Sequence, residues 1–196
     1  MVKRILISVF FIVITINSFA DSWEDPKITV TYSQNNEYAL VVHPRYYPKD
    51  YFTAKYQRQY KQGITKDTII PCYAVLYHFS NSDTTIIWKK YLVNITAPCE
   101  IIVSNDGKSI VSIDDWFSRG TKHAMVIYNE TGEAIVDFTL KEISPFPLDA
   151  YERTISSIWW GGRAEYLDNE RVKIYFRNQY DDVKERIFSI IHKYFE

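Results

Sequence analysis

The sequence has few of the residues that carry most enzyme chemistry, and the motifs that would organise them are absent. Its 196 residues include four histidines, two cysteines and six glycines. No two histidines have the spacing of an H-E-x-x-H zinc motif, and no serine lies in a G-x-S-x-G turn. We therefore predict no metal and no cofactor. Catalytic triads can assemble from distant segments, so an enzyme stays an open alternative.

An excess of charge of either sign is also lacking. The chain has 23 lysine and arginine residues against 24 aspartate and glutamate residues. Proteins that bind nucleic acid rely on many basic contacts to phosphates. This balance argues against a nucleic-acid partner.

No apolar run is long enough to cross a membrane, but a shorter one lies in the first twenty residues, MVKRILISVFFIVITINSFA. Lys3 and Arg4 precede an apolar stretch of about 12 residues, whereas a spanning helix needs about 20. Ser18-Phe19-Ala20 has the small-x-small pattern of a cleavage site. We predict a signal peptide at residues 1–20 and a periplasmic or secreted protein; a membrane anchor is the alternative.

Cysteine is too scarce for a disulfide scaffold. Cys72 and Cys99 are the two cysteines, and an exported protein meets an oxidising compartment that permits a bridge. One disulfide and two separate buried thiols are the alternatives.

What the chain has in abundance is aromatic residues, which favour strands. Short apolar or alternating runs come in pairs, and each pair flanks turn residues such as Asp106-Gly107. We therefore predict an all-β, mostly antiparallel fold. The pairs are 28–32 with 38–43, 72–79 with 85–93, 100–103 with 109–113, and 124–128 with 134–140.

The hairpins repeat along the chain. Residues 33–42 (SQNNEYALVV) align with 104–113 (SNDGKSIVSI), and the hairpin after each also aligns. The four-strand units resemble WD40-like and TolB-like propeller blades, and the chain also resembles uncharacterised secreted proteins of Bacteroidetes-type bacteria. The first resemblance implies one propeller-like domain over 21–196, with units at 28–93 and 98–140 and a partial one at 155–176. The second implies export and no known activity. Because two to three blades cannot close a propeller, the sheets must stack openly or as a sandwich, or close by oligomerisation.

The C-terminal segment predicts a helix over residues 181–195. Val183, Ile187, Ile190, Ile191 and Tyr194 would share one helical face, and acidic residues would lie in the first turn. Such a helix would cover a sheet face or edge.

Two adjacent carboxylates, Asp114 and Asp115, precede Trp116 at the end of a predicted strand. Neighbours on a strand point to opposite faces, so they cannot act as a pair without a bulge. We expect one of them to cap the following loop through the backbone N–H groups of residues 116–120. Use in metal binding or catalysis is the alternative.

Residues 44–66 replace a short loop with a long basic and tyrosine-rich insertion. Six basic residues accompany one acidic residue, and loops of this length are commonly functional. Tyrosine and arginine dominate binding hot spots. We predict a binding surface for an acidic protein or an anionic glycan; a purely structural insertion is the alternative. Its candidate residues are Arg45, Tyr46, Tyr47, Tyr51 and Arg58.

Trp159 and Trp160 alternate faces in a further predicted strand, so one is expected in the core and one nearer solvent. Trp160 is a candidate for stacking on a sugar, although core packing is the favoured interpretation.

These observations together predict an exported, non-enzymatic binding module, such as a periplasmic inhibitor or immunity-type protein that binds a protein or cell-envelope component. An envelope-acting hydrolase that uses Asp114 or Asp115, and a carbohydrate-binding module, are the alternatives.

Overall fold

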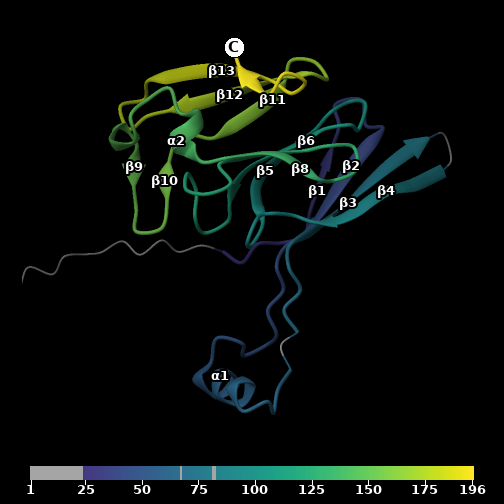
Figure 1. Ribbon diagram of the computed structural model, residues 1–196, viewed down its shortest axis with the longest axis vertical. Helices are drawn as coiled ribbons and strands as arrows, with labels where there is room; N and C mark the ends of the chain where they lie inside the picture. The colour runs from purple at the N-terminus through teal and green to yellow at the C-terminus, as the bar shows by residue number, and fades with distance from the viewer. Residues whose placement is uncertain (1–23, 67, 81–82) are drawn as a thin grey trace, which may run out of the picture.

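The computed structural model describes residues 24–66, 68–80 and 83–196, and most of its regular structure is antiparallel β (Figure 1). The predicted fold class is confirmed. The predicted signal peptide, residues 1–20, lies outside the described residues. Within the described ranges, no helix has the length and apolar character needed to cross a membrane.

Twelve strands form three four-stranded antiparallel sheets, and in each the spatial order of strands follows the chain. The first sheet contains β1 (Thr29–Tyr32), β2 (Tyr38–His43), β3 (Tyr73–Ser80) and β4 (Asp83–Tyr91). The middle sheet contains β5 (Pro98–Val103), β6 (Ile110–Asp115), β7 (Met125–Tyr128) and β8 (Ala134–Phe138). The last sheet contains β11 (Arg163–Tyr166), β12 (Arg171–Arg177), β13 (Val183–Ser189) and β14 (Tyr194–Phe195).

Short elements complete the fold. β9 (Glu152–Arg153) and β10 (Ile158–Trp159) form a small separate sheet. The helices are α1 (Ala54–Lys61), α2 (Leu140–Ile143) and the 3-10 turn η1 (Leu148–Ala150).

The four predicted hairpins are present, and two of their turns share the same hydrogen bonds. The Ser33 hydroxyl donates to Asn35 Oδ1 and accepts from Tyr38 N; the Ser104 hydroxyl donates to Asp106 Oδ1 and accepts from Ser109 N. These local bonds explain why the sequence predicts the turns well. The likeness to propeller blades stays a prediction.

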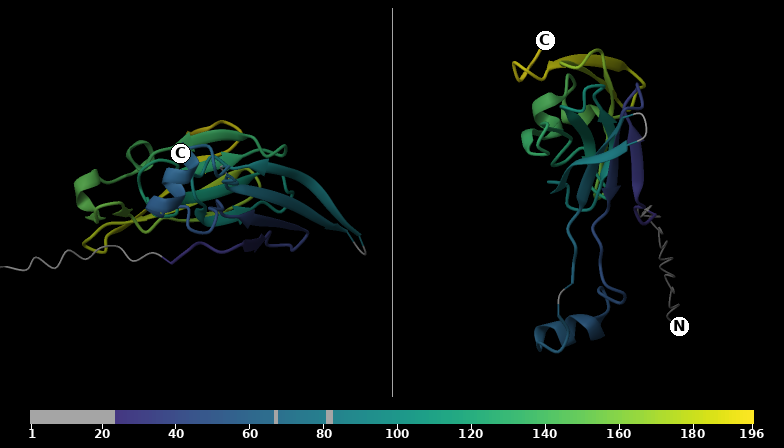
Figure 2. Two further views of the ribbon diagram at one scale, coloured as in Figure 1. Left: turned by 90° about the horizontal axis from the view of Figure 1, so that it is seen from below. Right: turned by 90° about the vertical axis from the view of Figure 1, so that its right-hand side faces the viewer.

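The middle sheet lies between the other two, and both of its faces are covered. Alternate residues of β6 and β7 pack against the last sheet on one side and the first sheet on the other. In Figure 2 the last sheet, in yellow, lies across the middle sheet. Residues Val111, Ile113, Met125 and Ile127 face the last sheet, and Ile110, Val126 and Tyr128 face the first. The stack therefore has two hydrophobic cores and two outer faces.

The two outer faces differ in composition. Cross-strand rungs on the first sheet are Val30–Val41–Val75–Lys89, Tyr32–Ala39–Tyr77–Ile86 and His43–Tyr73–Tyr91. Rungs on the last sheet are Arg163–Tyr175–Glu185, Glu165–Lys173–Ile187 and Arg177–Val183. The first set is mostly apolar and aromatic, while the second is mostly charged.

The predicted C-terminal helix is wrong, because residues 183–195 form β13 and β14 and complete the last sheet. The alternation of apolar and polar residues that is typical of a strand is not visible in this segment, because Lys184 and Arg186 occupy inward positions beside Phe188. Lys184 Nζ lies 4.4 Å from the ring centre of Phe146, and the Arg186 guanidinium lies 4.0 Å from that of Phe195. Long cationic side chains can cover apolar surface with their stems, so a polar residue here still contributes to the core.

The cysteines do not form a bridge. Cys72 and Cys99 are both free, so the disulfide alternative is wrong. Burial raises the pKa of each thiol to about 12, which keeps both protonated at neutral pH.

Candidate functional site

The basic insertion forms a projecting arm, which we define as residues 44–66 and 68–70. Figure 1 shows it leaving the body as two extended segments that end at α1. Thr53 caps this helix by accepting a hydrogen bond from Tyr56 N at 3.2 Å, and Tyr56 is the buried residue of the helix. A bridge between Tyr46 and Ile70 joins the two segments near the body. The sequence had predicted a loop here, and the structure gives it a helical tip.

A cleft of about 600 Å³ lies where the arm meets the body, and we call it the arm cleft. It brings together four of the five candidate residues from the insertion: Arg45, Tyr46, Tyr47 and Tyr51. The fifth, Arg58, lies on α1, is exposed and does not line the cleft.

Aromatic rings dominate one wall of the arm cleft. The Tyr47 ring centre lies 5.1 Å from that of Tyr51 and 4.9 Å from that of Phe52. The Arg45 guanidinium lies 5.2 Å from the Tyr47 ring centre, a cation–π distance. Arg45 Nε is buried and has no hydrogen-bond partner among the described residues.

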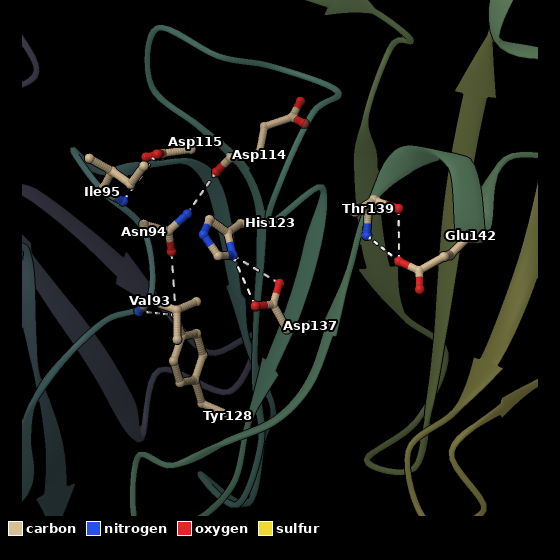
Figure 3. Close-up of polar contacts among 10 residues, drawn as sticks. All are labelled: Val93, Asn94, Ile95, Asp114, Asp115, His123, Tyr128, Asp137, Thr139 and Glu142. Carbon is tan, nitrogen blue, oxygen red and sulfur yellow. Dashed lines mark hydrogen bonds and ion pairs between the residues drawn. The ribbon is translucent and has the colours of Figure 1, made fainter.

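Asp115 fixes the body side of the cleft. Its carboxylate accepts a hydrogen bond from the backbone N–H of Ile95 at 3.0 Å (Figure 3). It also accepts from the backbone N–H groups of Thr96 and Ala97 at 3.1 and 3.3 Å. Thr96 lines the cleft, and its carbonyl accepts from Arg45 N at 2.8 Å. Asp115 therefore holds the loop on which the root of the arm rests.

Asp114 points to a different set of donors. Its carboxylate accepts from Gly120 N at 2.7 Å and from the Trp160 indole N–H at 2.9 Å. The bond to Gly120 is the predicted loop cap. Asp114 itself has a φ of 58°, and this left-handed conformation turns the strand end toward the loop.

Both carboxylates are buried, and burial raises the pKa of each. The pKa of Asp114 rises from 3.8 to about 6, because desolvation outweighs its hydrogen bonds. The pKa of Asp115 is also raised, again mainly by desolvation. Each carboxylate already has two or three donors and neither lines the arm cleft, so the geometry gives them a structural role.

The two aromatic residues after the carboxylates have separate positions. Trp116 donates a hydrogen bond from its indole N–H to the Glu24 carbonyl at 2.9 Å. The same residue lines a second cleft of about 380 Å³. Phe117 lines the arm cleft. The exit of β6 and the exit of β2 therefore meet at one site, although 72 residues separate Phe117 from Arg45.

Trp160 is buried in the core between the middle and last sheets. Its ring centre lies 5.2 Å from that of Phe176, and 1% of its surface is exposed. It therefore offers no face for stacking on a sugar. Trp159 is 38% exposed and has Arg119 over its ring, so the predicted division into one core and one outer tryptophan is correct.

Sequence reasoning missed several residues that line the arm cleft. Phe52 was inside the predicted insertion, and Phe117 directly follows Trp116, so both were adjacent to candidates. Asp25, Pro26 and Thr96 carried no such signal, because only the fold brings them to the arm.

The described residues include no group of three or more histidine, cysteine, aspartate and glutamate side chains placed to hold a metal ion. His123, the histidine nearest these carboxylates in sequence, is hydrogen-bonded to Asp137 at 2.9 Å (Figure 3).

Comparison with known proteins finds no family model that matches the chain and no curated protein that is significantly similar to it.

Proposed function

We propose that this chain is an exported, non-enzymatic binding module that binds a protein or cell-envelope partner at the arm cleft. A periplasmic inhibitor or immunity-type protein is the role we favour, built on propeller-like units. The observation that carries the proposal is the grouping of Arg45, Tyr46, Tyr47 and Tyr51 in one cleft.

The charge of the arm supports an acidic partner. Residues 44–66 hold six of the 23 basic residues and one of the 24 acidic residues, so the rest of the chain is acidic. A basic projection on an acidic body attracts negative surfaces and repels positive ones, which speeds association and selects partners. Tyrosine adds rigid contact area at a low entropic cost.

A quantitative pulldown from envelope extract tests the proposal. The test variant replaces Arg45, Tyr46 and Tyr47 with alanine. The matched control replaces Arg163, Tyr180 and Tyr194, which are an arginine and two tyrosines on the exposed surface of the last-sheet region. We expect the test variant to lose at least about 10-fold in recovery of a specific partner, a loss typical of hot-spot residues, while the control keeps it.

The same partner, once purified, should bind the wild type more weakly at high salt, because screening weakens contacts between exposed charges. Equal recovery by the wild type and the test variant would remove the arm cleft as the binding site.

A further inference from the structure

The outer face of the first sheet is apolar and open, while its inner face is packed. Val30, Tyr32, Ile86 and Tyr91 lie on this outer face and are 51–67% exposed. Their rungs hold one charged side chain, Lys89, whose ammonium lies 4.6 Å from the Tyr73 ring centre. Exposed apolar side chains gathered on one sheet face are typical of an interface.

The outer face of the last sheet, by contrast, carries charged side chains suited to contact with solvent. On its outer side, Lys173 lies 3.5 Å from Glu185 and 4.0 Å from Glu165, and the Tyr175 hydroxyl donates to Glu165. If two copies stacked head to tail, the apolar face would cover these ion pairs and remove their water without supplying new partners. That arrangement is unfavourable, because buried charges need compensation.

We propose that the outer face of the first sheet binds the same face of a second copy, in a two-fold symmetric dimer. An apolar face needs an apolar partner, and each copy supplies one that matches. Two-fold contact uses the same patch on both copies and closes the assembly at two. The two sheets would then pack about 10 Å apart, as in a β-sandwich.

The size of the face fits this occupant. An aromatic side chain can bury about 150–250 Å², so the exposed parts of Tyr32 and Tyr91, with the smaller Val30 and Ile86, contribute roughly 400 Å². The partly buried rings of Tyr73, Tyr77 and Phe79 extend the face toward the roughly 800 Å² that each partner buries in a standard interface. The two ends of the stack thus differ, because the outer face of the last sheet contacts solvent and that of the first sheet contacts a second copy of the chain. This inference does not depend on the proposed function.

The test measures mass in solution by light scattering and sedimentation, across a series of protein concentrations. The interface variant is Val30→Glu on β1, and the matched control is Val183→Glu on the outer face of the last sheet, where valine is 62% exposed. We expect a wild-type dimer, a dissociation constant at least about 10-fold weaker for Val30→Glu because a carboxylate is buried, and no change for Val183→Glu.

Tyr91→Glu on β4 provides a second interface variant, and circular dichroism checks that each variant is folded. Three results would overturn the proposal: a wild-type monomer at every concentration, interface variants that dimerise as tightly as the wild type, or assemblies that grow beyond two copies.

Discussion

The outer faces of the first and last sheets both lie at an end of the stack, yet one carries apolar side chains and the other carries charged ones. On the last sheet, Lys173 bridges Glu165 and Glu185 across three strands. On the first sheet, the equivalent rungs carry valine, tyrosine and isoleucine, and the His43 and Tyr73 rings stack 4.4 Å apart. Inward, the two sheets are alike, because each buries an apolar face against the middle sheet.

The difference shows that inward packing alone specifies the stack, while the outer residues decide what each end contacts. Apolar residues on both faces of a strand are expected where both faces are covered. The first sheet has this composition although it is covered on one side only. The comparison between the two sheets can be tested by substitutions, beginning with buried core residues and ending with residues on the outer faces.

The largest effect should come from the two cores. Phe176 of the last sheet and Leu76 of the first are both fully buried. Phe176→Ala should cost about 3–5 kcal/mol and Leu76→Ala about 2–5 kcal/mol, because each leaves a cavity. Urea unfolding measures both. Costs of similar size would confirm that the two sheets are equally packed inward; a cost below about 1 kcal/mol at Leu76 would show that the first sheet is loosely attached.

The next effect concerns the loop that joins the first sheet to the middle sheet. Asp115→Ala removes the acceptor of three backbone N–H groups at residues 95–97. Leaving partly buried donors without partners should cost about 2–4 kcal/mol. The matched control is Asp149→Ala, an exposed aspartate in η1.

Hydrogen exchange should locate the Asp115 effect. We expect faster exchange at Thr96 and at Arg45, whose N–H is bonded to the Thr96 carbonyl. Unchanged exchange at both residues would contradict the role of Asp115 in holding the arm.

On the side of the last sheet, Asp114 should make stability depend on pH. Its pKa is about 6 in the fold and 3.8 ordinarily, so the folded protein binds this proton more tightly than the unfolded chain does. The free energy of unfolding should therefore fall as pH rises from about 4 to about 6 and stay lower above that, by on the order of 3 kcal/mol.

Asp114→Asn should flatten this decline, and urea unfolding between pH 4 and 7 measures it. Asp115 and Glu100 also have raised pKa values, so part of the slope will remain in the variant. An identical pH profile in the wild type and the variant would show that Asp114 is not the group responsible.

Local sequence signals predicted the turns and the separate directions of the two carboxylates. The Asp106-Gly107 turn depends on nearby residues, and Gly107 has the positive φ of 67° that the turn requires. The bond from Gly120 to Asp114 spans six residues and was also within reach of such reasoning.

Contacts between distant segments were not predictable from the pattern. Trp160 donates to Asp114 across 46 residues, and Phe117 lines the same cleft as Arg45 only because the fold brings the two strand ends together. The last sheet was mistaken for a helix at β13 because Lys184 and Arg186 take inward positions over aromatic rings. In each case the tertiary neighbours decided the outcome.

The smallest effect should come from the ion pairs on the outer face of the last sheet. A double-mutant cycle with Lys173→Ala and Glu185→Ala should give a coupling energy below about 1 kcal/mol, because both partners are solvent-screened. The coupling should shrink further at high salt, where exposed charges are screened. Urea unfolding of the four proteins, each at low and high salt, measures it. A coupling above about 2 kcal/mol that resists salt would mean that this face is desolvated in solution, and the contrast between the two ends of the stack would then fail.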